Sequence, residues 1–371
     1  MPPQTHNDKV RQAVPAFVTT MSRSCHLFSE GSFHACFRVT VDDIVTMNLT
    51  FNRQTLPLRA DFLIAGTRCH LSTNSHDIMQ LASQRQSQTK LINTSSFEME
   101  VLVDSSRSDC CEQAAHFRGL RHIVFATLPH GSFVAFDLLR KRVHAALSPS
   151  ASRDLSFWNA LLLPITIGVL GTTLGVVPLH CACLDRKGKG LLVAGVSGAG
   201  KSTLAAALAQ RGFAFISDDW TYLTKQQSTL VAHGLFSPIK LLPDTIRFFP
   251  RLHEFVLRKT LNGEMAYEMD PQKFLQFIVT DMSRPGHIVF LERTATRGCH
   301  LVPCRPEYVR DFFEKSAERL PDELAEAKAM RTGIIHCFSA CPSWMLRTGE
   351  SPQRTAEAIE MFLSEAERAT A

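Results

Sequence analysis

The sequence lacks several patterns that mark common classes of protein. It has no long run of lysine or arginine among its 40 basic side chains, so we expect no nucleic acid as a partner. Its eleven cysteines include no paired C-x-x-C spacing, which argues against a zinc site and favours reduced thiols in a cytoplasmic protein. The first residues lack the basic-then-apolar order of a signal peptide. With 45% hydrophobic residues, the chain can nevertheless form an ordinary buried core.

One long segment, residues 157–179, carries no charge and would be long enough to span a bilayer. Proline and glycine interrupt it, at Pro164 and Gly171 among other positions. Its end, residues 175–178, has the pattern of a turn that leads into a strand. We therefore predict a buried core helix here and no membrane insertion.

The length of 371 residues suggests two domains. Residues 1–25 have the composition of a flexible polar tail. In residues 26–150, short runs of alternating apolar and polar residues predict half-buried strands and hence a β-rich or α+β N-terminal domain of unknown role. The clearest of these predicted strands are 37–41, 97–103, 122–127 and 133–137. Over residues 151–371 strands and helices alternate, which indicates an α/β domain.

Several elements of this α/β domain can be placed from the sequence. A helix is predicted to begin near Leu155, with Ser152 or Asp154 as its N-cap. The strands that follow are predicted at residues 176–184 and 190–194. Near the end of the chain, Ser351 and Pro352 are typical of an N-cap and a first helical residue, so we predict a last helix there.

The most specific motif lies between the strand at 190–194 and a helix predicted at 201–210. Residues 195–202 match the pattern G-x-x-x-x-G-K-S/T in full. Its glycines allow backbone angles that other residues resist, so that successive N–H groups can point inward at phosphate oxygens. The helix that follows adds the positive end of its dipole. The motif therefore predicts a phosphate loop for ATP or a similar nucleoside triphosphate.

The side chains of this loop have expected roles. We expect Lys201 to place its charge on the β- and γ-phosphates, and Ser202 to supply a hydroxyl ligand for Mg²⁺. The residues predicted to bind the nucleotide are Gly195, Ser197, Gly198, Ala199, Gly200, Lys201, Ser202 and Thr203. The predicted cofactors are therefore ATP and Mg²⁺.

A second element follows the loop helix closely. The apolar stretch 213–217 ends in two acidic residues, Asp218 and Asp219. Because ligands of open α/β sheets bind at the carboxyl ends of strands, we expect both carboxylates beside the phosphate loop. One of them could hold Mg²⁺, and the other could take a proton from an attacking hydroxyl group. The alternative interpretation of the pair is a helix cap or a solvated turn.

Four segments together resemble the C-terminal domain of the HPr kinase/phosphorylase family and related serine kinases. They are Pro178–His180, the loop at 195–202, Leu208–Gly212 and Ser217–Asp219. The resemblance implies a P-loop kinase fold of the type shared with phosphoenolpyruvate carboxykinase. It also implies transfer of the γ-phosphate of ATP to a serine or another hydroxyl group, and it makes a homo-oligomer an expectation.

The resemblance further implies roles for single residues. It places His180 near the reacting phosphate, and it favours Asp218 as the general base. It favours Asp219 as a ligand of Mg²⁺ or as the partner of His180. Together with Lys201 these residues are the predicted catalytic set, while Ser202 and Asp219 are the predicted metal ligands. Neighbouring carboxylates titrate as a pair, so the assignment between the two aspartates stays open.

One departure separates this chain from the family's metabolic regulator. Where that enzyme carries a signature close to E-I-R-G-L-G, residues 238–244 read P-I-K-L-L-P-D. This argues against phosphorolysis and against HPr as the acceptor, which leaves a hydroxyl group on a protein, peptide or small molecule. The alternative function is a nucleotide-binding regulatory module or an ATPase that transfers no phosphate to an acceptor. The second acidic residue favours a kinase, because a switch needs a metal carboxylate but no base.

Overall fold

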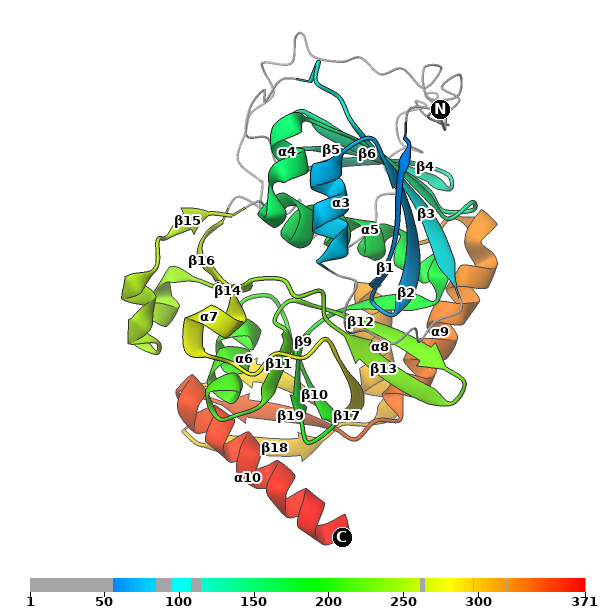
Figure 1. Cartoon of the computed structure of the whole chain (residues 1–371). Helices are drawn as coiled ribbons and strands as arrows, with labels where there is room; N and C mark the ends of the chain where they lie inside the picture. The colour runs from blue at the N-terminus through cyan, green and yellow to red at the C-terminus, as the bar shows by residue number, and fades with distance from the viewer. Residues whose placement is uncertain are drawn as a thin grey trace, which may run out of the picture.

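In a computed structural model, the described part of the chain forms a mixed α/β structure with three sheets. The described residues are 56–84, 95–107, 115–260, 264–295, 297–317 and 319–370. A seven-stranded sheet lies at the top of Figure 1, and a nine-stranded sheet lies below it. The expected tail at 1–25 and the strand predicted at 37–41 lie outside the described residues.

The upper sheet contains the strands expected from the alternating residues. Its order is β1-β2-β3-β7-β6-β5-β4. The strands are β1 (Leu58–Ile64), β2 (Thr67–Thr73), β3 (Ser96–Val103), β4 (His116–Leu120), β5 (Ile123–Leu128), β6 (Ser132–Asp137) and β7 (Arg142–Leu147). Strands β2, β3 and β7 are parallel to one another, and the other neighbours are antiparallel. The strands predicted at 97–103, 122–127 and 133–137 are confirmed as β3, β5 and β6.

The long apolar segment folds as one helical run beneath the upper sheet (Figure 1). It consists of the π-helix η3 (Phe157–Leu162), the α-helix α5 (Leu163–Leu170) and the 3-10 turn η4 (Gly171–Leu174). Of the two predicted caps, Asp154 acts at its start, where Oδ1 accepts a hydrogen bond from the N–H of Ser156 (2.8 Å). The run is long and apolar enough to cross a membrane, but 89% of it is buried inside the protein, as expected of a core helix. Two short helices, α3 (His76–Ser83) and α4 (Pro149–Arg153), pack near it.

The lower sheet carries the phosphate-loop motif. Its main path is β11-β9-β10-β17-β13-β12-β8, and β19 pairs with both β17 and β18. The strands are β8 (Val176–His180), β9 (Ala182–Arg186), β10 (Lys189–Ala194), β11 (Ala214–Ser217), β12 (Trp220–Gln226), β13 (Thr229–His233), β17 (Met282–Arg293), β18 (Cys299–Pro303) and β19 (Ser343–Thr348). Strands β10, β17 and β19 are parallel. Strand β11 also runs in the direction of β10, because both are antiparallel to β9.

The strand predicted at 176–184 is in fact two strands. The chain bends at Cys181, whose N–H donates a hydrogen bond to the carbonyl of Leu179 (2.9 Å). Before the bend β8 pairs with β12, and after it β9 pairs with β10 and β11. The prediction of one continuous strand was therefore wrong. Apolar residues lie on both sides of Cys181, so the sequence gives no sign of the bend. The bend leaves His180 at the end of β8, opposite Trp220 of β12.

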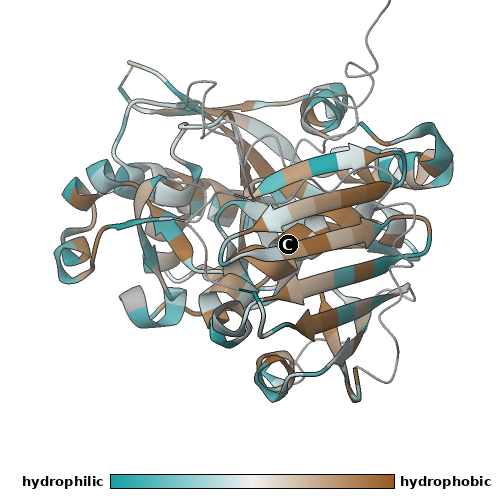
Figure 2. Ribbon diagram, turned by 90° about the horizontal axis from the view of Figure 1, so that it is seen from above, coloured by the Kyte–Doolittle hydropathy of each residue, from teal (hydrophilic) through white to brown (hydrophobic). Residues whose placement is uncertain are grey.

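Helices cover both faces of the lower sheet. The loop helix α6 (Lys201–Gln210) and α10 (Pro352–Thr370) lie on one face, where their apolar residues form a core with Leu191 and Val193 of β10. Helices α8 (Pro306–Ser316) and α9 (Ala325–Ser339), preceded by η7 (Asp322–Leu324), cover the other face, where Leu192 is buried. Coverage on both sides explains the continuous apolar run of β10. Brown, apolar segments accordingly gather on the strands in Figure 2, whereas teal segments gather on the helices and loops at the rim.

The ends of the two predicted helices agree with the structure. Helix α6 spans the residues expected of the loop helix, and Gly212 follows it with a positive φ of 88°. At the start of α10, the N–H of Arg354 donates to Oγ of Ser351 (3.3 Å), so Ser351 is the predicted N-cap.

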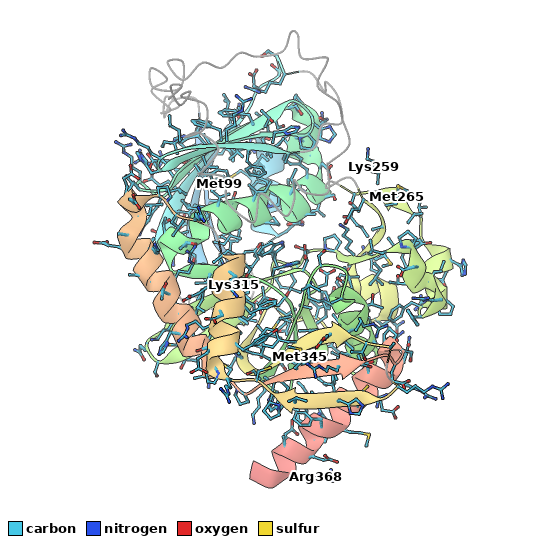
Figure 3. All side chains as sticks on the ribbon, turned by 180° about the vertical axis from the view of Figure 1, so that it is seen from behind. Met99, Lys259, Met265, Lys315, Met345 and Arg368 are labelled. Carbon is cyan, nitrogen blue, oxygen red and sulfur yellow. The ribbon has the colours of Figure 1, made fainter. Side chains whose placement is uncertain are left out.

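A small side sheet, built from residues 239–241, 258–259 and 265–269, stands next to the lower sheet. Its order is β14-β16-β15. Its strands are β14 (Ile239–Leu241), β15 (Arg258–Lys259) and β16 (Met265–Met269), and the short helices around it are η5 (Pro243–Arg247), η6 (Pro250–Glu254) and α7 (Pro271–Leu275). Lys259 and Met265 are paired across β15 and β16 and mark its outer edge in Figure 3.

One hydrophobic core joins the upper sheet, the apolar helical run and the edge of the lower sheet. Its buried side chains include Phe136 of β6, Leu163 of α5 and Tyr222 of β12. The helical run, which begins after residue 150, thus packs on strands that precede that residue. The division into domains at residue 150 stays a prediction.

Candidate functional site

The phosphate loop connects the end of β10 to the first residue of α6. All three glycines adopt positive φ angles, 149° at Gly195, 78° at Gly198 and 95° at Gly200. At Gly195 a side chain is also excluded by space, because an added Cβ would lie 2.8 Å from the carbonyl oxygen of Leu291. The backbone conformation that was predicted from the glycines is therefore present, and it depends on the neighbouring strand β17 as well as on the loop.

Lys201 is held inside this loop. Its side chain is buried, and Nζ donates hydrogen bonds to the carbonyl oxygens of Gly195 (3.2 Å) and Val196 (3.4 Å). Burial lowers the pKa of Lys201, although the negative charges of Asp219 and Asp218 act in the opposite direction. Phosphate oxygens are charged, so they accept stronger hydrogen bonds from an ammonium group than backbone carbonyl oxygens do. The buried ammonium group of Lys201 is therefore suited to bind phosphate.

The remaining loop residues differ in exposure. Ser197 and Gly198 are exposed at the tip, whereas Ala199 is buried against the core. Ser202 and Thr203 are half-buried in the first turn of α6, where the N–H groups of a helix have no partners within the helix. The loop and the first turn of α6 thus offer backbone donors and the hydroxyl groups of Ser202 and Thr203.

The acid pair lies in the bend between β11 and β12. Strand β11 runs in the direction of β10, so the residues that follow β11 lie at the same edge of the sheet as the phosphate loop. The structure therefore brings Asp218 and Asp219 to the loop edge, and both aspartates influence the charge state of Lys201. The alternative of a helix cap does not apply, because both neighbouring elements are strands.

The two carboxylates have opposite environments. Asp218 is 5% exposed, and its Oδ2 accepts a hydrogen bond from the backbone N–H of Lys240 (2.9 Å). Burial raises the pKa of Asp218 to about 7, and the negative charge of Asp219 adds to this shift. A carboxyl group with such a pKa can change protonation state near neutral pH.

Asp219 has the more open position, with 55% of its side chain exposed. Its Oδ1 lies 2.9 Å from Nε2 of His180. Burial would raise the pKa of Asp219, but the hydrogen bond and charge of His180 and the charge of Lys201 outweigh it and hold the pKa below its usual value. The His180 ring stacks on the indole of Trp220, with ring centroids 5.2 Å apart, which fixes its orientation. Environments that separate the pKa values of two carboxyl groups are typical of an acid–base pair.

A buried hydrogen-bond network fixes the acid pair to the bend at Cys181. Oγ of Ser217 lies 2.7 Å from Oγ1 of Thr221, so the residues on either side of the pair are joined. Thr221 in turn donates to the carbonyl oxygen of Cys181 (2.9 Å). Because His180 precedes Cys181, one network positions both His180 and the two aspartates.

Two cavities flank this centre. The first, which we call the acid-pair cavity, has a volume of about 120 Å³ and lies between the apolar helical run and the side sheet. Asp218, Asp219 and Tyr222 are among the residues that line it. The second, which we call the loop cavity, has a volume of about 170 Å³ and follows the phosphate loop from Gly198 to Leu204. The acid pair and the loop thus line two different cavities.

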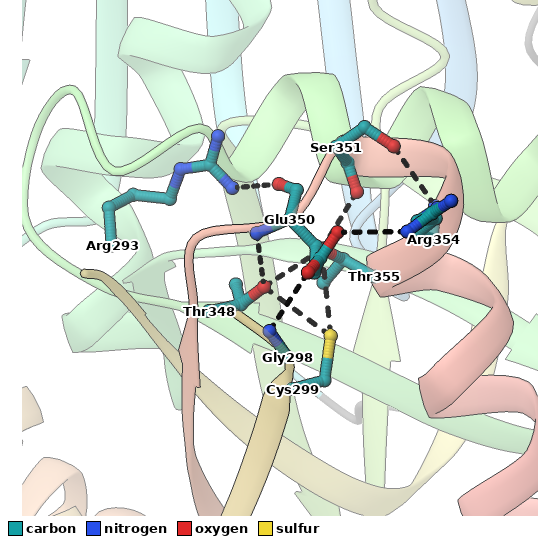
Figure 4. A network of polar contacts seen from close by, with 8 residues as sticks. All are labelled: Arg293, Gly298, Cys299, Thr348, Glu350, Ser351, Arg354 and Thr355. Atoms are coloured by element: carbon teal, nitrogen blue, oxygen red, sulfur yellow. Dashed lines mark hydrogen bonds and ion pairs between the residues drawn. The ribbon is translucent and has the colours of Figure 1, made fainter. Parts of the chain in front are cut away.

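A polar network adjoins the loop cavity through Arg293 and Thr355, which line it. Figure 4 shows this network. Nη1 of Arg293 donates to the carbonyl of Glu350 (2.8 Å), and the N–H of Gly298 donates to Oε1 of the same residue (2.8 Å). Oγ1 of Thr348 accepts from the N–H of Glu350 (3.0 Å) and lies 3.2 Å from Oγ1 of Thr355. The network connects the end of β17 to the first turn of α10, and it places an arginine beside the phosphate loop.

Sequence reasoning missed several residues of this centre. Lys240 lies in the segment where the family signature is absent, and its backbone binds Asp218 while its Nζ pairs with Glu264. Trp220 follows the acid pair directly but carries no chemical motif. Arg293 lies far from the loop in the sequence. Only Lys240 offered a signal, since it lies in the segment that departs from the family pattern.

The donor set fits Mg²⁺. This ion prefers oxygen ligands, and in phosphate-binding sites it uses one or two carboxylates, keeps several waters and takes its remaining ligands from the phosphates. Asp219 offers an exposed, ionised carboxylate at the loop edge, and Ser202 offers a hydroxyl group at the start of α6. No cluster of three or more histidine, cysteine or acidic residues suited to a metal occurs within the described part of the chain.

Comparison with known families tests the resemblance that the motifs suggested. Residues 175–237 match the family model of the HPr Serine kinase C-terminal domain. The matched segment contains His180, the phosphate loop and the acid pair. It ends directly before the segment at 238–244 where the signature of the HPr kinases is absent. The resemblance read from the sequence is therefore confirmed for this part of the chain.

Two further comparisons carry less information about the family of the chain. A solved structure of the HPr(Ser) kinase/phosphatase from Coxiella burnetii is similar over 51% of this chain and 98% of its own, at 13% sequence identity and a TM-score of 0.30. No curated protein matches the chain. With so low a TM-score, the likeness to HPr kinases rests on the sequence match of residues 175–237.

Proposed function

We propose that the chain is an ATP- and Mg²⁺-dependent kinase that transfers the γ-phosphate to a hydroxyl group of an acceptor. The match of residues 175–237 to the HPr kinase domain supports a kinase or phosphatase role. The observation that favours transfer to an acceptor is the pair of unequal carboxylates at the loop edge, one with a raised and one with a lowered pKa. A regulatory switch needs a metal carboxylate but no second, protonatable one.

In the proposed reaction the phosphate loop holds the donor. Backbone N–H groups of residues 195–202 and the ammonium group of Lys201 bind the β- and γ-phosphates. The nucleoside end of ATP occupies the loop cavity, where Arg293 adds positive charge beside the loop. Ser202 and Asp219 are the ligands proposed for Mg²⁺, which when bound would neutralise charge on the phosphates.

Asp218 is the proposed general base. The acceptor hydroxyl group transfers its proton to the carboxylate of Asp218, its oxygen attacks the γ-phosphorus, the bond to the β-phosphate oxygen breaks, and ADP leaves. A pKa of about 7 suits this step, because a base works best when its pKa lies near the working pH. His180 is a positioning residue: through its 2.9 Å contact it keeps Asp219 ionised and oriented.

Labelled ATP tests this function. Purified full-length chain is incubated with γ-labelled ATP, Mg²⁺ and a cell extract, and label on acceptors is compared with label in free phosphate. We expect label on an acceptor, and a loss of about 10²–10⁴-fold in Asp218→Asn, because general-base catalysis contributes by that order. Asp311→Asn, which changes an exposed aspartate on α8, is the matched control. Label in free phosphate alone, or unchanged transfer by Asp218→Asn, would contradict a kinase.

A further inference from the structure

The acid-pair cavity contains a buried group that nothing in the proposed reaction uses. Tyr222 lies on β12, is 1% exposed, and lines the cavity together with Asp218 and Asp219. Its hydroxyl group is buried and has no hydrogen-bond partner within the described part of the chain. Buried polar atoms are nearly always paired, so an unpaired hydroxyl group beside a cavity points to a ligand. Burial raises the pKa of Tyr222, and the negative charge of Asp219 adds to this shift.

The size of the cavity limits what can enter it. A single water needs roughly 10–15 Å³ in this kind of volume, so about 120 Å³ has room for roughly ten non-hydrogen atoms. Ala160, Leu161 and Pro164 of the apolar helical run close one side, and Thr260 of the side sheet closes another. These walls belong to elements that are packed into the fold, since most of the helical run is buried.

The charges of the cavity restrict the ligand further. Three carboxylates line it, those of Asp218, Asp219 and Glu268. Lys240 is the one lysine in the lining, and its Nζ is already paired with Glu264. A negatively charged ligand would therefore meet mainly repulsion, whereas a neutral or positively charged one would not.

We propose that the acid-pair cavity binds the acceptor of the kinase, and that this acceptor is a small neutral or cationic alcohol with a partly apolar body. The apolar body packs against Ala160, Leu161 and Pro164. The hydroxyl group of the acceptor meets Asp218, and the hydroxyl group of Tyr222 forms a hydrogen bond to the acceptor and positions it. The inference rests on the proposed kinase function, and it specifies the acceptor class that the sequence left open between protein, peptide and small molecule.

The test first separates this inference from the function on which it rests. Binding of Mg²⁺·ATP to the full-length chain is measured alone, and its absence would count against the kinase itself. A cell extract is then divided by filtration at about 1 kDa, and the filtrate is passed over an anion exchanger. The retained macromolecules, the anionic small molecules and the neutral or cationic small molecules are each incubated with γ-labelled ATP and the chain. We expect label in the neutral or cationic fraction.

Two variants test the cavity directly. Tyr222→Phe removes only the hydroxyl group. We therefore expect the KM for the acceptor, supplied as the fraction that became labelled, to rise about 3- to 10-fold. The affinity for ATP should stay unchanged. Ala160→Trp fills the cavity and should abolish transfer while ATP still binds. Leu155→Trp, at an exposed residue just before the same helical run, is the matched control and should behave as the unchanged chain.

Several outcomes would overturn the inference while leaving the kinase intact. These are label only on macromolecules and label only on anionic small molecules, whereas ATP binding without label in any fraction would count against the kinase itself. An equal rise of the KM values for ATP and acceptor in Tyr222→Phe would indicate a structural role for the hydroxyl group. Full transfer by a folded Ala160→Trp variant would show that the acceptor binds elsewhere.

Discussion

Replacing Asp218 by asparagine is expected to make the protein more stable at alkaline pH and inactive in phosphoryl transfer. Asparagine has the shape of aspartate, and its side-chain oxygen can still accept the hydrogen bond from the N–H of Lys240. The substitution therefore changes mainly the charge at a position that is 5% exposed. It also removes the basicity that the proposed mechanism requires.

The magnitude follows from the pKa of Asp218. Its pKa is about 7 in the folded protein, against the ordinary value of 3.8. Between these values the folded state binds more protons than the unfolded state, so the free energy of unfolding decreases as the pH rises from about 4 to about 7. A difference of about 3 pH units corresponds to about 4 kcal/mol at pH 8, as an upper limit. The Asp218→Asn variant does not lose this free energy of unfolding as the pH rises. Its stability relative to the unchanged chain should therefore grow from near zero at pH 4 to a few kcal/mol at pH 8.

Thermal unfolding at pH 5 and pH 8 measures this advantage. For a domain of 150–250 residues, 1 kcal/mol shifts the Tm by roughly 2–4 °C, so we expect Asp218→Asn to unfold several degrees higher at pH 8, and by roughly half that margin or less at pH 5. Asp311→Asn, which changes an exposed aspartate outside the site, is the matched control. An Asp218→Asn advantage of equal size at both pH values, or a loss of stability at pH 8, would refute the assignment of a raised pKa.

Three other substitutions test the geometry of the site. Gly195→Ala should abolish ATP binding or folding, as judged by calorimetry and circular dichroism, because its Cβ would lie 2.8 Å from the carbonyl oxygen of Leu291 and its φ is 149°; wild-type affinity would contradict this. Gly234→Ala should lower the Tm by many degrees, because its Cβ would lie 2.1 Å from the carbonyl oxygen of Ile216 on the strand that carries the acid pair. An unchanged Tm would show that the backbones at Gly234 and Ile216 do not lie this close together. Asp219→Asn should raise the Mg²⁺ concentration needed for half-maximal transfer, and an unchanged requirement would argue against Asp219 as a ligand.

Local patterns predicted the backbone conformation of residues 195–202 and the helix that follows them. The loop depends on consecutive glycines and on the first turn of a helix, so its conformation is encoded within a few residues. The position of the acid pair was also predictable, because an apolar strand shortly after the loop helix returns to the same edge of the sheet. The buried helical run at Phe157–Leu174 was predictable for a similar reason, since its composition suits only an apolar environment.

Contacts between distant segments could not be predicted in this way. The bend at Cys181 depends on Thr221, forty positions later in the chain, and lies within a continuous apolar stretch. The raised pKa of Asp218 depends on burial by the folded sheet and on the backbone of Lys240. The cavity beside Tyr222 forms only when the apolar helical run and the side sheet meet above β12. None of these has a short-range signature in the sequence.

Isothermal titration calorimetry of Mg²⁺·ATP binding tests the central claim most directly. We predict saturable binding that depends on Mg²⁺, and a loss of affinity of roughly 10- to 100-fold in Lys201→Ala, because a hydrogen bond to a charged group contributes about 1.5–3 kcal/mol. Lys187→Ala, which removes a lysine that is 72% exposed and lies outside the loop, should bind as the unchanged chain does. Binding of equal affinity by a folded Lys201→Ala variant, or no binding by the unchanged chain, would contradict the assignment of residues 195–202 as a phosphate loop.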